Sequence, residues 1–165
     1  VVNYARACAR KLREQQIKLL VVACNTVSAV ALDILSAELD FPVLGVIAPG
    51  ARAGVRSSRS GRLGVLCTPG TVLSGAYPRA VAAVSPDVKV FDEAAPLLVP
   101  LVEEGWLEGD VPRLAVRKYL GALVQHDIDA LVLGRHPEFV ARQVHRYRWK
   151  QLARVRCSNR WRHRM

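Results

Sequence analysis

Apolar positions alternate between two periods along the chain, and this alternation predicts the fold class. Short continuous apolar runs, typical of strands buried in a parallel sheet, occupy residues 18–23, 42–47, 63–66, 88–91 and 128–133. Between these runs, apolar residues at helical spacing predict helices over residues 3–16, 27–38, 71–84, 95–104 and 113–126. Strands that alternate with helices form βαβ units. We therefore expect an α/β fold with parallel-sheet, flavodoxin-like doubly wound units.

The first predicted helix is amphipathic. Tyr4, Ala7, Cys8 and Leu12 recur at helical spacing, and charged residues such as Arg10 occupy the other side. The apolar side is therefore expected to pack against the rest of the protein.

The positive charge is concentrated near the C-terminal end. Residues 1–134 contain 14 Lys and Arg against 13 Asp and Glu, a net charge of +1, whereas residues 135–165 contain ten against one, a net charge of +9. A nearly neutral body is typical of an enzyme of small metabolites. The basic end leaves a second interpretation open, which is nonspecific nucleic-acid binding by phosphate contacts and base stacking. The residues for it are Arg142, Arg146, Tyr147, Arg148, Trp149, Arg154, Arg156, Arg160 and Trp161.

Residues 135–165 also lose the hydrophobic pattern. They carry nine arginines, two of the three tryptophans and no glycine, and their apolar residues keep no sustained period. Residues 140–152 fit at most a marginal basic helix without a good core face. We expect this segment to be an Arg-rich tail that is disordered or results from a shifted reading frame.

The most informative chemical feature is Cys24, which lies between a predicted buried strand and a predicted helix. Ligands of doubly wound folds bind just outside the carboxyl ends of the strands, and a helix N-terminus favours a thiolate. The side chains of Asn25 and Thr26 are well placed to hold a carboxylate. This pattern favours proton abstraction, or recognition of an anionic substrate, by a positioned thiolate. The alternative is a small core cysteine, with Asn-Thr as a helix cap.

Several stretches resemble the glutamate racemase family, in the same order as in that family. They are Ala-Cys-Asn-Thr at 23–26, Phe-Pro-Val-Leu-Gly-Val-Ile at 41–47, Pro-Gly-Ala-Arg-Ala at 49–53, Leu-Gly-Val-Leu-Cys-Thr-Pro-Gly-Thr-Val-Leu-Ser-Gly-Ala-Tyr at 63–77, Ala-Pro-Leu-Leu-Val-Pro-Leu-Val-Glu-Glu-Gly at 95–105 and Ile-Asp-Ala-Leu-Val-Leu-Gly at 128–134. The Cys-Asn-Thr element is shared with aspartate and hydantoin racemases. The Pro-Leu-Leu-Val-Pro and Pro-Gly-Ala stretches are more particular to glutamate racemases.

The resemblance implies interconversion of L- and D-glutamate without cofactor or metal, by two cysteines on opposite faces of the α-carbon. Cys24 matches the first of these cysteines, and Asn25 and Thr26 match substrate-binding partners. Thr68 and Thr71 match a Thr-x-x-Thr element whose hydroxyls lie near the substrate in the family. Ordinary turn and helix-capping roles are the alternative for both of these threonines.

The resemblance also carries expectations about organisation and cellular role. Residues 1–47 would be a remnant of the first racemase domain, and residues 48–134 would be a second α/β domain. The two-domain architecture would thus be only partly present. Glutamate is the expected partner, a homodimer the expected assembly, and D-glutamate for peptidoglycan the expected product. Four cysteines without CxxC spacing, and no apolar run of about 20 residues, favour a cytoplasmic protein without a membrane span.

Two elements of the family pattern are missing. The family opens with a strand and an Asp-Ser-Gly-x-Gly-Gly loop, and a Tyr-Gly pair follows, whereas this chain begins downstream of both. The family strand at residues 128–134 continues into Gly-Cys-Thr-His-Tyr-Pro, but here Gly134 is followed by Arg135, His136 and Pro137. The second catalytic cysteine is therefore absent from that motif. A reading-frame shift near Gly134 would explain both this loss and the Arg-rich segment, and an inactive racemase remnant is the alternative function.

Overall fold

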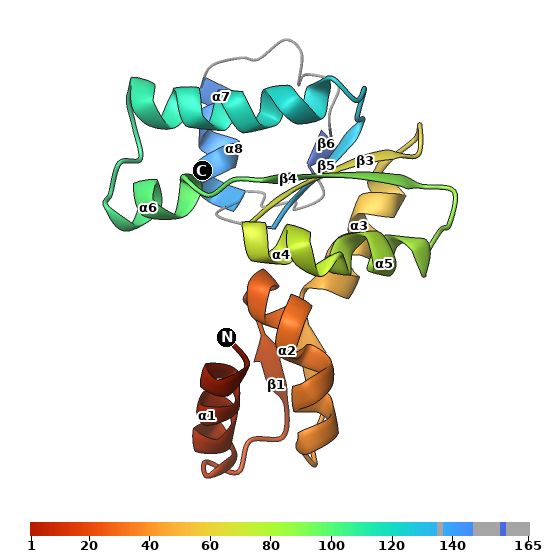
Figure 1. The fold of residues 1–165 in the computed structure, drawn as a ribbon, viewed down its shortest axis with the longest axis vertical. Helices are drawn as coiled ribbons and strands as arrows, with labels where there is room; N and C mark the ends of the chain where they lie inside the picture. Colours follow the sequence, from red (N-terminus) through yellow and green to blue (C-terminus); the bar gives the residue numbers. More distant parts are fainter. Residues whose placement is uncertain (135–136, 147–155, 158–165) are drawn as a thin grey trace, which may run out of the picture.

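Two parallel sheets form the framework of the protein (Figure 1). The structure is a computed structural model and describes residues 1–134, 137–146 and 156–157. The smaller sheet pairs β1 (Leu20–Val22) with β2 (Val43–Gly45). The larger sheet has the order β4-β3-β5-β6, with all pairs parallel. Its strands are β3 (Arg62–Cys67), β4 (Lys89–Ala94), β5 (Ala130–Leu133) and β6 (Arg156–Cys157). The predicted α/β class with parallel sheets is confirmed.

Two helices pack beside the smaller sheet. They are α1 (Val2–Arg13) and α2 (Asn25–Glu38), and their shared core consists of Ala9, Val22, Ala31 and Leu35. Ion pairs Arg6–Glu38 and Arg13–Asp40 join α1 to the C-terminal end of α2 and to the residues that follow it. Both pairs are substantially exposed, so solvent screening keeps their contribution to stability small.

The prediction that the apolar side of α1 packs against the protein is wrong. Tyr4 is 81% exposed, and Cys8 and Leu12 are exposed too, whereas Ala9 is the buried residue of the helix. Tyr4, Cys8 and Leu12 line an apolar groove together with Val21 of β1. Short alanine side chains bring α1 close to α2, and this turns the larger apolar residues outward.

One face of the larger sheet is covered by α3 (Ile47–Ser57) and α5 (Ala76–Ala82). Their core with the sheet consists of Ile47, Ala51, Leu63, Val65, Cys67, Tyr77, Val81, Ala130 and Val132. A Cβ at Gly54 would lie 2.8 Å from side-chain atoms of both Leu63 and Val132, so only glycine permits this approach of α3 to the strands.

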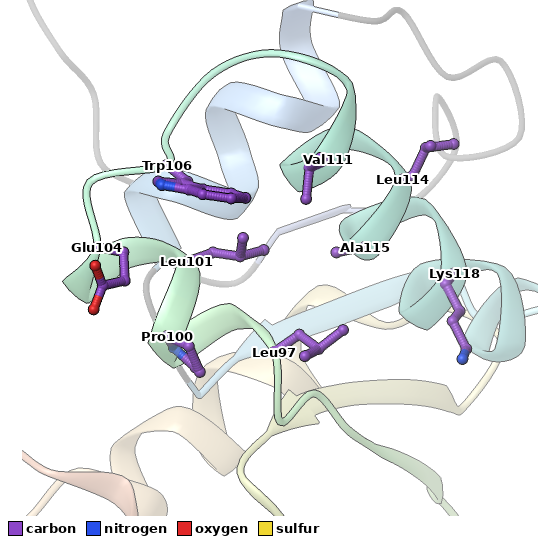
Figure 2. Close-up of a pocket in the computed structure, with 9 residues that line it drawn as sticks. All are labelled: Leu97, Pro100, Leu101, Glu104, Trp106, Val111, Leu114, Ala115 and Lys118. Atoms are coloured by element: carbon purple, nitrogen blue, oxygen red, sulfur yellow. The ribbon is translucent and has the colours of Figure 1, made fainter.

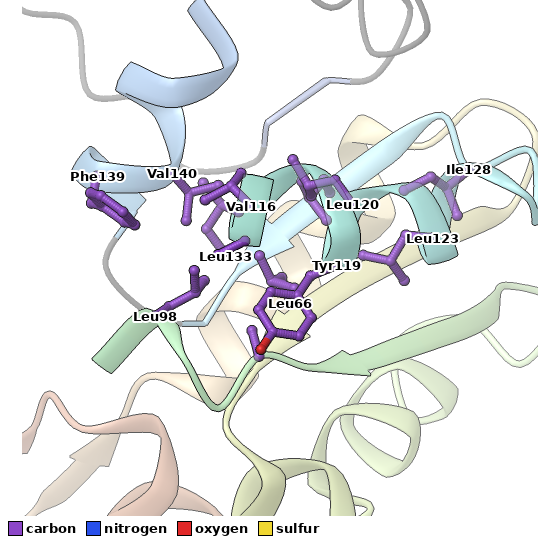
Figure 3. Close-up of a cluster of buried hydrophobic side chains, with 13 residues drawn as sticks. Leu66, Leu98, Val116, Tyr119, Leu120, Leu123, Ile128, Leu133, Phe139 and Val140 are labelled. Carbon is purple, nitrogen blue, oxygen red and sulfur yellow. The ribbon is translucent and has the colours of Figure 1, made fainter. Parts of the chain in front are cut away.

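The other face is covered by α6 (Leu98–Glu103), α7 (Asp110–Val124) and α8 (Pro137–Arg146). Figure 3 shows side chains of α7 turned toward β3 and β5, with Phe139 and Val140 of α8 beside them. Leu66, Leu98, Val116 and Leu120 are fully buried in this cluster. Helices on both faces make the larger sheet a doubly wound unit.

Two features of the helices differ from the sequence prediction: one predicted helix is divided, and one helix was not predicted. The helix predicted over residues 71–84 is divided into α4 (Pro69–Ser74) and α5, because Gly75 adopts a left-handed φ of 62° between them. Helix α3 was not predicted, since Pro49, Gly50 and Gly54 weaken a helical pattern in the sequence. Proline is tolerated in the first helical turn, where N–H groups have no partner within the helix.

Helix α8 corrects the expectation for part of the basic segment. A marginal helix without a good core face was expected over residues 140–152, but α8 begins earlier, at Pro137, and buries Val140 together with Phe139, which precedes the predicted range. The Gln143 Nε2 group donates a 2.8 Å hydrogen bond to the Leu107 carbonyl. Residues 137–146 are therefore packed as a helix, whereas residues 135–136, 147–155 and 158–165 lie outside the described part. Among the described helices, none combines the length and hydropathy needed to cross a bilayer.

Candidate functional site

Cys24 lies where β1 passes into α2. It is the N-cap residue of α2, with extended backbone (φ −85°, ψ 123°), and its side chain is partly exposed. The carbonyl of Cys24 accepts a 2.8 Å hydrogen bond from the N–H of Ser28. The buried Ser28 hydroxyl in turn donates to the Val22 carbonyl at 2.9 Å and accepts from the Val46 N–H at 3.3 Å. These bonds fix the turn that presents Cys24 at the carboxyl ends of β1 and β2.

Three threonine hydroxyls from two separate elements meet next to this turn. Thr26 Oγ1 lies 2.9 Å from Thr68 Oγ1 and 3.4 Å from Thr71 Oγ1. The hydroxyls of Thr68 and Thr71 are 3.0 Å apart. A hydroxyl can rotate and exchange one partner for another, so this cluster can donate to a carboxylate without backbone movement.

Both roles that the sequence allows for Thr68 are compatible with the geometry. Its hydroxyl accepts a 3.2 Å hydrogen bond from the Thr71 N–H, which makes Thr68 the N-cap of α4. The same hydroxyl contacts Thr26, so capping and site formation coincide. Thr71 is buried, and Thr26 and Thr68 are partly exposed. A role of these threonines in substrate binding stays a prediction.

Tyr77 is a member of the cluster that sequence reasoning did not single out. Its hydroxyl donates a 2.6 Å hydrogen bond to Asn25 Oδ1. Burial, aided by the nearby Cys67 thiol, raises the pKa of Tyr77 well above its usual value. A tyrosine in the second turn of a predicted helix carries no signal of such a contact in the sequence.

The end of β5 also lies beside Asn25. A Cβ on Gly134 would lie 3.6 Å from Asn25 Cγ and 3.0 Å from Cys67 Cβ. Gly134 therefore brings the end of β5 against the Asn25 side chain. The residues that follow, Arg135 and His136, lie outside the described part of the chain. Most of the residues of the nucleic-acid interpretation lie there too.

The other cysteines differ from Cys24 in their surroundings. Cys67, at the end of β3, is 1% exposed, and burial together with the charge of Asp92 raises its pKa to about 12. A thiol in that state is a poor base and does not face solvent. Cys8 is exposed on α1. Cys157 is paired by its backbone with Leu131, two residues before the end of β5.

A separate apolar pocket of about 510 Å³ lies between α6 and α7 (Figure 2). Leu97, Leu101, Trp106, Val111 and Leu114 line it, with Glu104 and Lys118 on its opposite sides. None of the residues from the threonine cluster lines this pocket. This mainly apolar pocket is therefore separate from the threonine cluster at the strand ends.

Residues 2–134 match the family of Asp/Glu/Hydantoin racemases. The chain belongs to this family. The match ends at Gly134, where the basic segment begins, and the resemblance noted from the sequence motifs is confirmed.

Relatives of this chain include glutamate racemases. That of Geobacter metallireducens is 49% identical over 134 residues, which cover 81% of this chain and 50% of the relative. That of Aquifex aeolicus is 42% identical over 148 residues, which cover 89% of this chain and 57% of the relative. The chain thus spans about half the length of these relatives.

Solved structures of the racemase family share the fold. The glutamate racemase of Francisella tularensis in complex with D-glutamate has a TM-score of 0.82 and 28% identity, covering 94% of this chain and 57% of that chain. The enzyme from Aquifex pyrophilus has a TM-score of 0.77 and 38% identity, covering 96% and 60%. The packing of both sheets is therefore that of a racemase, over part of its length.

Proposed function

We propose that the protein binds glutamate at the carboxyl ends of β1 and β3 and that Cys24 exchanges its α-proton. The observation that carries the proposal is the meeting of Thr26, Thr68 and Thr71 beside the turn of Cys24. Threonine hydroxyls and the amide of Asn25 suit a carboxylate, and a helix N-terminus favours negative charge. The family and the glutamate racemases among its relatives support glutamate as the substrate.

In the proposed chemistry, proton transfer takes place on only one face of the α-carbon. The Cys24 thiolate takes the α-proton, and the electron pair left on the α-carbon is delocalised into the adjacent carboxylate. Inversion needs a second acid on the opposite face. The resemblance assigns this acid to a cysteine directly after Gly134, where this chain has Arg135. Cys67 does not fit the role, because it is buried and packed within the core. We therefore propose exchange with retention, with little inversion.

The wider role is part of the same proposal. Residues 1–47 would be the Cys24-bearing part of the first racemase domain, and residues 48–134 the second domain. In a complete racemase of this family, the product D-glutamate would enter peptidoglycan synthesis in the cytoplasm, and the assembly would be a homodimer. The alternative is an inert remnant, in which the same fold binds or exchanges no glutamate.

The test is α-proton exchange of glutamate in D2O, followed by the loss of the α-proton NMR signal. The wild-type chain should incorporate deuterium. Cys24→Ala should lower the rate by a factor of about 10² or more, the contribution typical of a positioned general base. Cys8→Ala, which removes an exposed thiol outside the site, should leave the rate unchanged. Absence of exchange in the wild-type chain would establish the inert remnant instead.

A further inference from the structure

The hydrogen bond between Tyr77 and Asn25 crosses from one sheet unit to the other. Tyr77 belongs to α5, which packs on the larger sheet, and Asn25 is the first residue of α2, beside the smaller sheet. The phenol is 3% exposed, whereas Asn25 is partly exposed. The tyrosine is thus a buried support, and the asparagine is the group within reach of a ligand.

The direction of this bond determines what Asn25 offers. The Tyr77 hydroxyl donates a 2.6 Å hydrogen bond to Asn25 Oδ1. A side-chain amide has one acceptor oxygen and one NH2 group with two donors. With its oxygen engaged by Tyr77, and with no bond from its NH2 group to another described residue, Asn25 can offer its two N–H donors to a further acceptor. A carboxylate oxygen accepts such donors, whereas a flipped amide would present its oxygen to the carboxylate and repel it.

The surroundings limit both side chains to this arrangement. A Cβ at Gly50 would lie 3.2 Å from the Tyr77 hydroxyl, so α3 passes close to the phenol. On another side, a Cβ at Gly134 would lie 3.6 Å from Asn25 Cγ. The amide of Asn25 is therefore located between the phenol and the end of β5, and the phenol itself is located by α3.

We propose that Tyr77 is a positioning residue, which fixes the amide of Asn25 so that its NH2 group donates to a carboxylate of an amino-acid substrate. Tyr77 acts through Asn25 and does not touch the substrate. This inference rests on the proposed function for its ligand, but the orientation of Asn25 is measurable without any ligand.

The first measurement is the order parameter of the Asn25 side-chain NH2 group by 15N relaxation, in the full chain without glutamate. Tyr77→Phe removes only the hydroxyl oxygen and should lower the order parameter of Asn25. Tyr119→Phe is the matched control, because Tyr119 is also buried and its hydroxyl accepts a hydrogen bond from the Leu97 N–H, away from the site. An unchanged Asn25 in Tyr77→Phe would overturn the proposal, whether or not glutamate binds.

The second measurement is glutamate affinity in a double-mutant cycle. Tyr77→Phe and Asn25→Ala should each weaken the Kd by about tenfold, the effect of losing one well-placed hydrogen bond to a charged group. The double variant should be no weaker than Asn25→Ala alone, since Tyr77 acts through Asn25. Tyr119→Phe should bind like wild type. Additive losses, or a wild-type Kd in Tyr77→Phe, would overturn the proposal. If wild type binds no glutamate, the proposed function fails, and the order parameter still decides the role of Tyr77.

Discussion

The two sheet units differ sharply in how well their apolar side chains are covered. In the larger sheet, Leu63, Val65 and Leu66 of β3 are fully buried, because helices cover both faces. In the smaller sheet, Val21 of β1 is 57% exposed and Leu44 of β2 is 54% exposed. The candidate catalytic thiol belongs to the less covered unit. Thr68 and Thr71, which contact Thr26 next to the turn of Cys24, belong to the well-packed unit, so the stability of the site depends on contacts between the two units.

The largest expected difference between the units concerns stability. Leu120→Ala in α7 should lower the free energy of unfolding by about 2–5 kcal/mol, because it leaves a cavity in a fully buried cluster. Leu44→Ala makes the same chemical change on the exposed β2 and should cost within about 0.5 kcal/mol. Urea unfolding of both variants measures the contrast. Equal losses would mean that the smaller sheet is covered in solution.

A second contrast concerns the contact between α3 and the larger sheet. Gly54→Ala should destabilise the protein by about 1–3 kcal/mol, because the added methyl group would overlap Leu63 and Val132. Gly121→Ala is the control on α7, where a Cβ meets no atom within 4 Å. It should stabilise the protein by about 0.5–1 kcal/mol through helix propensity. Thermal unfolding should separate the two variants, and a neutral Gly54→Ala would show that α3 is not held tightly.

The turn that presents Cys24 can be tested through Ser28. Ser28→Ala removes the hydroxyl that joins the Val22 carbonyl to the Val46 N–H, and it should cost about 1 kcal/mol. Ser57→Ala removes a hydroxyl that bonds only within its own helix, to the Ala53 carbonyl at 2.8 Å, and should cost less. Chemical denaturation compares them. If Ser57→Ala proved the more damaging, the bonds of Ser28 would not stabilise the smaller sheet.

The smallest expected effect is a pH dependence within the larger unit. Burial opposes ionisation of Asp129, but hydrogen bonds from the Ser58 hydroxyl and from the N–H groups of Arg59 and Ser60 outweigh it and hold the pKa of Asp129 below its usual value. A lowered carboxyl pKa stabilises the fold above about pH 4, and this stabilisation is lost as the pH falls through the folded-state pKa.

Asp129→Asn should therefore be less stable than wild type at pH 7, by about 1 kcal/mol or less, because the carboxylate is partly exposed to solvent. The difference should shrink toward pH 3. Asp87→Asn, at an exposed turn residue, is the control and should follow wild type at both pH values. A deficit of Asp129→Asn that stayed constant with pH would count against the ionised carboxylate.

The sequence predicted most of this framework for physical reasons. Parallel strands buried on both faces give continuous apolar runs, so β3 and β5 were recognisable. Cys24 also followed a continuous apolar run, although Val21 in that run is exposed, and its position at a strand end could be inferred from the order of elements. Thr26 and Thr68 matched family motifs, but their meeting depends on how two distant segments pack, and no local pattern encodes that.

The features that sequence reasoning missed depend on contacts between elements. Tyr77 holds Asn25 across 52 positions in the chain. Helix α3 forms in spite of Gly54 because that glycine fits against the sheet. The apolar residues of α1 predicted to be buried are exposed, since helical spacing identifies a face but not the neighbour that covers it. Val140 is buried, although the arginines around it hide the apolar pattern.

The central claim is that proton transfer takes place on one face of the α-carbon. Its most direct test is the ratio of deuterium exchange to inversion, measured on one glutamate sample in D2O. Chiral separation gives inversion, and mass spectrometry gives deuterium at the α-carbon. If Cys24 is the one acid–base group at the α-carbon, as the described residues of the proposed site suggest, deuterium should accumulate in the starting enantiomer well ahead of inversion. Inversion at the same rate as exchange would contradict this, because it would require a second proton donor on the opposite face.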